Sequence, residues 1–179
     1  MKIRFAGFNT YLLGLLIAAA VACETTGEKK TSEKRHKGKE ATTLRLHLEV
    51  NRDGTDRNGP VPVFRDQPVM VNVNHEAFLN EGDVQEAAVV ETRGGYAVMV
   101  QFDKHGTLVL NSVSSAFKGS RVAIFSQFGD ARWLAAPIIN RRITDGILTF
   151  TPDATREEAE RIVRGLNNIA KELKKKPHA

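Results

Sequence analysis

Cysteine is almost absent from this chain of 179 residues, in which Cys23 is the single example. A lone cysteine excludes a disulfide framework within the chain and a zinc site built on several thiolates. Aromatic residues are also few, at 7%, but hydrophobic residues make up 41% of the sequence. That content is enough for a folded core, so a wholly disordered chain is excluded and the length suits one domain with flanking segments.

A large excess of one charge is also missing from the part of the chain that can fold. Of the 26 basic and 21 acidic side chains, eight basic and four acidic ones lie in residues 1–40. Residues 41–179 therefore carry 18 basic and 17 acidic side chains, and the basic excess sits in Lys174, Lys175 and Lys176. Since no basic face that could follow phosphates is visible, we expect no nucleic-acid partner.

Long apolar runs are confined to the first 22 residues. Lys2 and Arg4 precede an apolar run from Tyr11 to Ala22, and small residues close the run. This is the anatomy of a signal peptide over residues 1–22. A retained membrane anchor from Phe5 to Ala22 is the alternative, but a run this short with small residues at its end favours cleavage.

Cys23 follows this run directly. The four residues Ala20-Val21-Ala22-Cys23 resemble the lipobox of bacterial lipoproteins, in which cleavage leaves a cysteine that carries diacylglycerol. The resemblance implies that Cys23 is lipidated and anchors the chain in an envelope membrane, inner or outer, through acyl chains that make the attachment stable. The remainder of residues 23–42 is rich in charged and small polar residues and is predicted to be a flexible tether.

Residues 43–174 have the patterns of a folded domain, and residues 175–179 are left as a basic tail. The alternation from Leu44 to Val50 predicts a half-buried strand, with His47 on its exposed polar face. The turn-rich stretch 51–60 should end this strand. Further strands are expected at residues 61–64, 69–73, 84–91, 96–102, 122–125, 133–139 and 147–150.

Two helices interrupt these strands. Asp103 is placed to cap the first helix, and Gly119 is a plausible left-handed stop after it. Thr155 and Glu158 form a capping box for the second, whose apolar stripe runs to Leu173. The order of elements predicts an α+β fold, with a mostly antiparallel sheet, two main helices packed on it and a β-α-β-β-α core.

Catalytic motifs are missing. The sequence has no nucleophile elbow, no phosphate-binding glycine-rich loop and no H-E-x-x-H pair. The histidines show no ligand spacing, and His105, whose nearest carboxylate in sequence is Asp103, has no nucleophile placed with it. Ser112, Ser114 and Ser115 are interpreted as helix-surface residues. We therefore expect no enzyme, no metal and no cofactor, although a hydrolase whose site is assembled from distant residues stays open as an alternative.

Candidate partner-binding residues cluster at one predicted turn. Phe128 and Trp133 lie on either side of the Gly129-Asp130 pair and could form a binding tip with Asp130, while core packing is the competing interpretation for Trp133. Arg142 is a further candidate for surface contact with a partner.

Four ordered segments resemble the first periplasmic domain of SecD, a subunit of the bacterial protein-export machinery. They are Ala135-Ala136-Pro137-Ile138-Ile139, Ile143-Thr144-Asp145-Gly146, Phe150-Thr151 and Glu157-Glu158-Ala159. The resemblance extends from Val61 to Leu173 and departs from the family at Asp145, where glycine is common. It implies a SecD-head-like fold.

The resemblance also implies partners, because the family acts in protein export. No apolar span follows Ala22, so the chain lacks the membrane helices of a proton-driven motor. We therefore expect a lipid-anchored, non-enzymatic binding module that faces the periplasm and contacts exported polypeptides or translocon subunits. The alternative is a structural adapter lipoprotein, whose domain only binds another envelope component.

Overall fold

The computed structural model describes residues 40–175. The expected signal peptide, Cys23, most of the tether and residues 176–179 lie outside the described residues. Neither helix of the described part combines the length and apolarity needed to cross a bilayer. In chain order the elements are β1 (Thr43–Leu48), β2 (Asn58–Val63), β3 (Val69–Asn74), β4 (Leu79–Asn80), the 3-10 turn η1 (Glu81–Asp83), β5 (Val84–Thr92), β6 (Gly95–Phe102), α2 (Lys104–Ala116), β7 (Val122–Gln127), β8 (Ala131–Ala135), β9 (Ile147–Phe150) and α3 (Arg156–Lys175).

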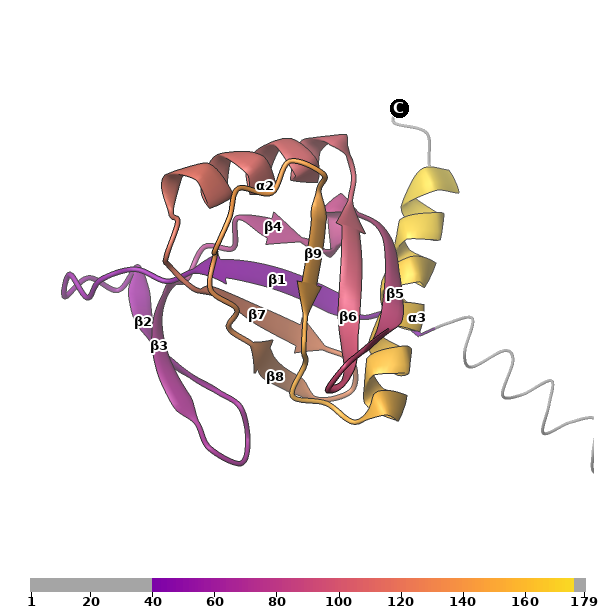
Figure 1. Cartoon of the computed structure of the whole chain (residues 1–179), viewed down its shortest axis with the longest axis horizontal. Helices are drawn as coiled ribbons and strands as arrows, with labels where there is room; N and C mark the ends of the chain where they lie inside the picture. The colour runs from indigo at the N-terminus through magenta and orange to yellow at the C-terminus, as the bar shows by residue number, and fades with distance from the viewer. Residues whose placement is uncertain (1–39, 176–179) are drawn as a thin grey trace, which may run out of the picture. The chain divides into compact units, whose positions relative to one another are not determined.

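These strands form three antiparallel sheets (Figure 1). The first sheet has the order β4-β1-β7-β8, the second β5-β6-β9, and β2 and β3 form a separate hairpin. The main core joins the first two sheets to both helices through buried side chains such as Leu46, Val100, Leu110, Ile124 and Ile162. The predicted α+β class with antiparallel pairing and two helices is confirmed, although three sheets replace the single one expected.

The helix boundaries follow the capping residues. The Asp103 carboxylate accepts the Gly106 N–H at 2.8 Å, and Gly119 adopts φ 94° soon after α2 ends. At the start of α3 the Thr155 N–H donates to Glu158 Oε2 and the Glu158 N–H donates to Thr155 Oγ1. Each cap satisfies amide groups that the first turn of a helix leaves free, which is why sequence reasoning found these ends.

Strand boundaries were harder to predict. β2 begins at Asn58 and therefore includes Gly59, which we expected to lie in the turn before this strand. An outer strand tolerates Gly and Pro because it pairs on one side only. The strand expected over 133–139 ends at Ala135, and beyond it Ile138 pairs with Arg121 through an isolated bridge. β4 and η1 carry no periodic pattern and were not predicted.

The expectation for His47 was wrong. Its exposed fraction is 7%, because the hairpin β2–β3 covers the face of β1 that the alternation marks as polar. A second, smaller core lies under this hairpin and contains Val63, Val73 and Ala136. β1 is thus buried on both faces at His47, while Leu44 and Leu46 face the main core and Arg45, on the same face as His47, stays exposed.

Helix α3 is held by polar contacts on two sides. The Asn167 side chain accepts the Ala87 N–H and donates to the Ala87 C=O, both at 2.8 Å, and so covers the outer edge of β5. On another side Thr42, 1% exposed, lies against Gly165, where a Cβ would overlap Thr42 Oγ1 and stand 2.9 Å from Thr42 N. Only glycine permits this approach of the first described residues to the helix.

Replacing Gly165 by alanine should therefore destabilise the domain. The added methyl group has no room, so we expect the free energy of unfolding to fall by about 1–3 kcal/mol despite the better helix propensity of alanine. Urea unfolding followed by circular dichroism measures the change. Gly94→Ala is the matched control, because nothing lies within 4 Å of a Cβ there. Equal stability of the two variants would contradict the packing role of Gly165.

Candidate binding surface

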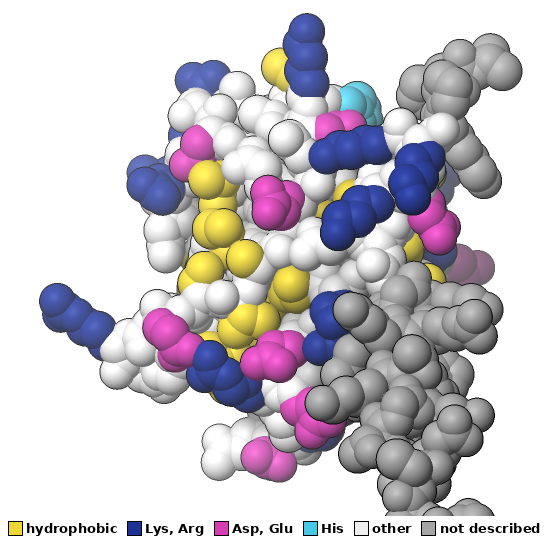
Figure 2. All heavy atoms as spheres, turned by 90° about the vertical axis from the view of Figure 1, so that its right-hand side faces the viewer, with side chains coloured by type: hydrophobic (Ala, Val, Ile, Leu, Met, Phe, Trp, Pro, Cys, Tyr) yellow, Lys and Arg dark blue, Asp and Glu magenta, His cyan; other side chains and the backbone are white. Residues whose placement is uncertain are grey.

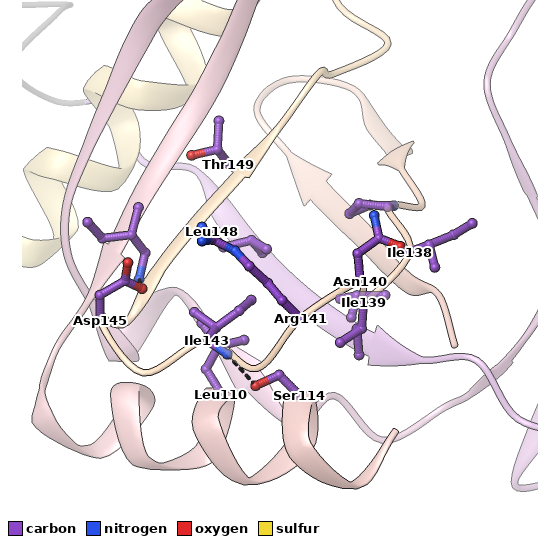
Figure 3. A pocket seen from close by; sticks show the side chains of 13 residues that line it. Leu110, Ser114, Ile138, Ile139, Asn140, Arg141, Ile143, Asp145, Leu148 and Thr149 are labelled. Atoms are coloured by element: carbon purple, nitrogen blue, oxygen red, sulfur yellow. Dashed lines mark hydrogen bonds between the residues drawn. The ribbon is translucent and has the colours of Figure 1, made fainter. Parts of the chain in front are cut away.

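A hollow of about 230 Å³ opens between β9, α2 and the segment 137–143 (Figure 3). Apolar side chains dominate its lining: Leu110, Val122, Ile138, Ile139, Ile143, Ile147 and Leu148. Ser114, Asn140, Arg141, Asp145 and Thr149 are the polar groups. We call this hollow the β9 groove. Its apolar lining with a few polar groups is typical of a ligand-binding surface, although the hollow is small for a drug-sized molecule.

Hydrogen bonds from α2 and β7 fix the outer wall of the β9 groove. The Ser114 hydroxyl accepts the Ile143 N–H at 2.9 Å (Figure 3), and Arg142 Nε donates to Asn111 Oδ1 at 2.6 Å. The Val122 N–H donates to the Pro137 C=O. Ser114 is 1% exposed, so our interpretation of it as a surface residue was wrong; a serine at one helical spacing from Leu110 faces inward to bind this segment.

β9 presents unpaired backbone groups along the β9 groove. The Phe102 N–H donates to the Gly146 C=O, so in antiparallel pairing the backbones of Leu148 and Phe150 also face β6. Ile147 and Thr149 must then turn their N–H and C=O groups outward. The Ile147 N–H is taken by Asp145 Oδ1 at 3.1 Å, whereas no described residue bonds the outward groups of Thr149.

The outer edges of β5, β8 and β2 are covered or blunted, and the second half of β3 is covered by Val50, whose N–H donates to the Asn72 C=O. Asn167 occupies the outer edge of β5, and the Asp153 N–H donates to the Leu134 C=O on the outer edge of β8. On β2, Pro60 and Pro62 lack an N–H and cannot donate to an added strand. The edge of β9 therefore offers a place for pairing with an extended chain, and it is the open edge that runs along the groove.

Arg141 supplies an unneutralised charge to this surface. Its side chain extends from the outer wall across the β9 groove toward β9 (Figure 3). It is exposed and forms no hydrogen bond or ion pair with any residue between 40 and 175. The groove therefore combines apolar walls, an open strand edge and one free guanidinium group. Arg141 and Thr149 were missed by sequence reasoning, because no local pattern marks an edge that depends on sheet order.

The predicted tip residues lie elsewhere. Asp130 is exposed at the β7–β8 turn, but the Phe128 ring is 4% exposed and packs in the main core beneath the Arg132 guanidinium, 4.9 Å from the ring centroid. Trp133 is partly buried in contact with His47. The structure thus corrects the view of Phe128 as a surface side chain, because the turn folds its ring inward. Arg142, by contrast, lies beside the β9 groove.

His47 and Trp133 form a small aromatic cluster under the hairpin. Their ring centroids are 5.1 Å apart at 70°, and Phe125 lies 5.3 Å from Trp133 in a similar edge-to-face arrangement. His47 Nδ1 lies 2.8 Å from the Asn74 C=O. Burial lowers the pKa of His47 below its usual 6.5, partly opposed by the bond to Asn74, while the charges of Arg45 and His75 lower it further.

A second polar cluster joins Asp83, Asp103 and His105, whose ligand atoms lie within 4.8 Å of one another. His105 Nδ1 bonds Asp83 at 2.8 Å, so the carboxylate that contacts it is not Asp103, its nearest in sequence. Both carboxylates already cap local structure: Asp83 accepts the Asn80 N–H and Asp103 accepts the Gly106 N–H. The cluster is explained by these structural bonds, and no nucleophile belongs to it.

Comparisons with known proteins give a consistent picture. Residues 59–168 match the family described as SecDF, P1 head subdomain. A solved structure of SecDF, described as a membrane component that enhances protein export, is similar with a TM-score of 0.55 and 17% identity over 82% of this chain and 71% of that chain.

A crystal structure of SecDF in a super-membrane-facing form has the same TM-score and 18% identity over 81% of this chain. This chain covers only 21% of that much longer one. No curated protein sequence matches the chain. At these identities the solved structures show a shared fold.

The buried histidine predicts a pH dependence of stability. Because the pKa of His47 is lower in the folded state, the unfolded chain binds more protons near pH 6.5, and the free energy of unfolding should fall as the pH drops through about 6.5. Urea unfolding between about pH 8 and pH 5 measures the slope. His47→Asn keeps an N–H donor for Asn74 but does not titrate, so it should flatten this part of the curve. An unchanged slope would show that His47 does not carry the effect.

Proposed function

Since this chain belongs to the family of SecDF P1 head subdomains, we propose that it is a lipid-anchored, non-enzymatic module that holds exported polypeptides in extended form at the bacterial envelope. Its family makes it an export-related periplasmic module. The lipid anchor, the absence of catalysis and the polypeptide partner are the parts that this proposal adds.

One observation carries the choice of partner: the open edge of β9 runs along an apolar groove. An extended polypeptide can add a strand to such an edge, since main-chain hydrogen bonds are independent of sequence. Thr149 offers the free N–H and C=O for this pairing. Leu148 and Ile143 offer apolar contacts for side chains of the added chain. A module of this kind suits exported polypeptides, because their sequences differ but all of them offer the same main-chain N–H and C=O groups.

The composition of the β9 groove supports binding over catalysis. It contains one carboxylate, Asp145, and no histidine. Asp145 Oδ1 accepts the Ile147 N–H, so this group serves the local turn. A hydrolase would need a paired acid and base, or a nucleophile beside a base, within reach of one substrate.

The role of the remaining predicted surface residues is part of the same proposal. Arg142 lies next to the β9 groove and is placed to contact a bound polypeptide. Asp130, with a side chain 76% exposed, marks a separate surface at the β7–β8 turn, and the partly exposed Trp133 lies further along β8 against His47. A translocon subunit or another envelope protein is the partner we assign to that second surface.

Blocking the edge of β9 tests the polypeptide partner. Thr149→Pro removes the outward N–H without removing a bond to β6, because Thr149 faces away from that strand. We expect binding of unfolded, fluorescently labelled polypeptide to the full chain to weaken at least about tenfold. Fluorescence anisotropy gives the dissociation constant.

Thr149→Val is the matched control, since it keeps the N–H and the side-chain shape and should bind as the native chain does. Circular dichroism checks that both variants fold. If Thr149→Pro folds and binds unfolded polypeptide as tightly as Thr149→Val, strand addition at β9 is wrong.

Lipid anchoring is tested separately at Cys23. The native chain should incorporate radiolabelled palmitate in bacteria and sediment with membranes, because the acyl chains hold it there. Cys23→Ala should incorporate none. Mass spectrometry of the N-terminal peptide identifies the modification, and an unmodified native thiol at Cys23 would contradict the anchor.

A further inference from the structure

The first described residues lie on the outer surface of α3. The Glu40 carboxylate is 3.5 Å from Arg161 Nε and 3.3 Å from Arg164 Nε, and Asn168 Nδ2 donates to the Glu40 C=O at 3.0 Å. Thr42 is buried against Gly165. Glu40, the first described residue, is therefore held against α3.

Covalent geometry limits how far α3 can be from a lipid on Cys23. The 17 peptide steps between Cys23 and Glu40 span at most about 60 Å. A link of this length keeps the domain close to the membrane, and so raises the effective concentration of its surface at the lipid headgroups. The link alone leaves the domain free to turn, so a surface interaction is needed to set its orientation.

The C-terminal end of α3 has the charge for such an interaction. Lys171, Lys174 and Lys175 are exposed and follow the i, i+3, i+4 spacing of one helix face. Glu172 is the one acidic residue among them, and none of the three lysines forms an ion pair with a carboxylate within residues 40–175. Lys174 Nζ makes a single long contact, 3.5 Å from the Gln85 C=O.

The acidic residues of α3 lie mostly at its other end. Glu157 and Glu158 are in the first turn, and Glu160 pairs with Arg156. Arg161 and Arg164 are neutralised in part by Glu40. Figure 2 looks onto the α3 side of the molecule and shows Lys and Arg side chains predominating in its upper part, the end at which α3 finishes in Figure 1. The helix thus presents one basic end.

We infer that the lysine-bearing end of α3, Lys171 to Lys175, docks on anionic phospholipid headgroups of the membrane that holds the chain. The inference rests on the lipid anchor of the proposed function. Basic side chains are attracted to an anionic bilayer within a Debye length of about 10 Å, and the anchor, with a reach of about 60 Å, lets the domain encounter the bilayer often enough to enter that range. No α3 residue lines the β9 groove, so this docking leaves the groove open to an exported polypeptide.

Two exposed leucines offer matched positions for a distance measurement in the full chain. Leu173, 47% exposed, lies among the lysines, and Leu108, 61% exposed, lies on α2. Leu173→Cys and Leu108→Cys each carry a fluorescent donor, and vesicles carry a headgroup acceptor. A lipidated Cys23 has no free thiol, so label at Cys23 in the native chain reports a missing lipid.

In vesicles that contain phosphatidylglycerol, we expect more energy transfer from position 173 than from position 108. This excess should be absent in pure phosphatidylcholine vesicles and should disappear at about 0.5 M NaCl, where screening is short-ranged. It should also disappear in the triple variant Lys171→Gln, Lys174→Gln, Lys175→Gln. Circular dichroism checks that the triple variant keeps its fold.

Flotation with phosphatidylcholine vesicles measures the anchor separately. A chain that does not float contradicts the anchor of the proposed function and the docking that rests on it, so transfer is compared in a chain that floats. Equal transfer from the two positions in anionic vesicles overturns the docking of α3. An excess that survives both salt and the triple variant overturns the assignment to the lysines.

Discussion

Helix α3 is the element on which the other features depend, because it bonds the backbone of β5 and packs closely against the backbone at Thr42. Asn167 pairs with the Ala87 peptide and thereby closes the outer edge of β5. Gly165 lets Thr42 approach closely, which holds the first described residues against the helix. The first contact leaves β9 as the open edge of its sheet, and the second determines which surface a tether would draw toward a membrane. One helix therefore influences both the binding surface and the orientation.

The β9 groove and the lysine end of α3 lie on different elements, so the two proposed interactions would not compete. The groove combines an apolar lining with the outward backbone of Thr149 and the unneutralised Arg141, features suited to a polypeptide of varying sequence. The end of α3 is polar and basic, which suits anionic lipid headgroups but not the apolar side chains of a bound polypeptide. Under the proposed function, a lipid-tethered head subdomain would hold a polypeptide near the membrane.

Local signals predicted much of this fold. Asp103, Thr155 and Glu158 marked the helix starts correctly, because capping depends on residues that are neighbours in sequence, whereas α2 ends at Ala116 with Phe117 as its C-cap, two residues before the expected stop at Gly119. Alternation located most strands for the same reason. The errors fall where a second element decides the outcome: His47 is buried because a hairpin covers it, Ser114 because a loop returns to α2, and Phe128 because its turn folds inward. The Asp83–His105 bond likewise joins residues brought together by the β5–β6 hairpin.

The sequence by itself determined the α+β class, the helix starts, the near-neutral charge of the domain and the resemblance to SecD heads, since periodicity, caps and motif order are local or linear properties. Only the tertiary structure decided which strand edge stays open, which cation lacks a partner and against which helix the first described residues lie. The physical reason is that backbone groups and charges are satisfied by whatever lies nearby in space. Thr149 and Arg141 are available because no described residue lies close enough to bond them. The sequence around each residue does not show this, because distant segments decide it.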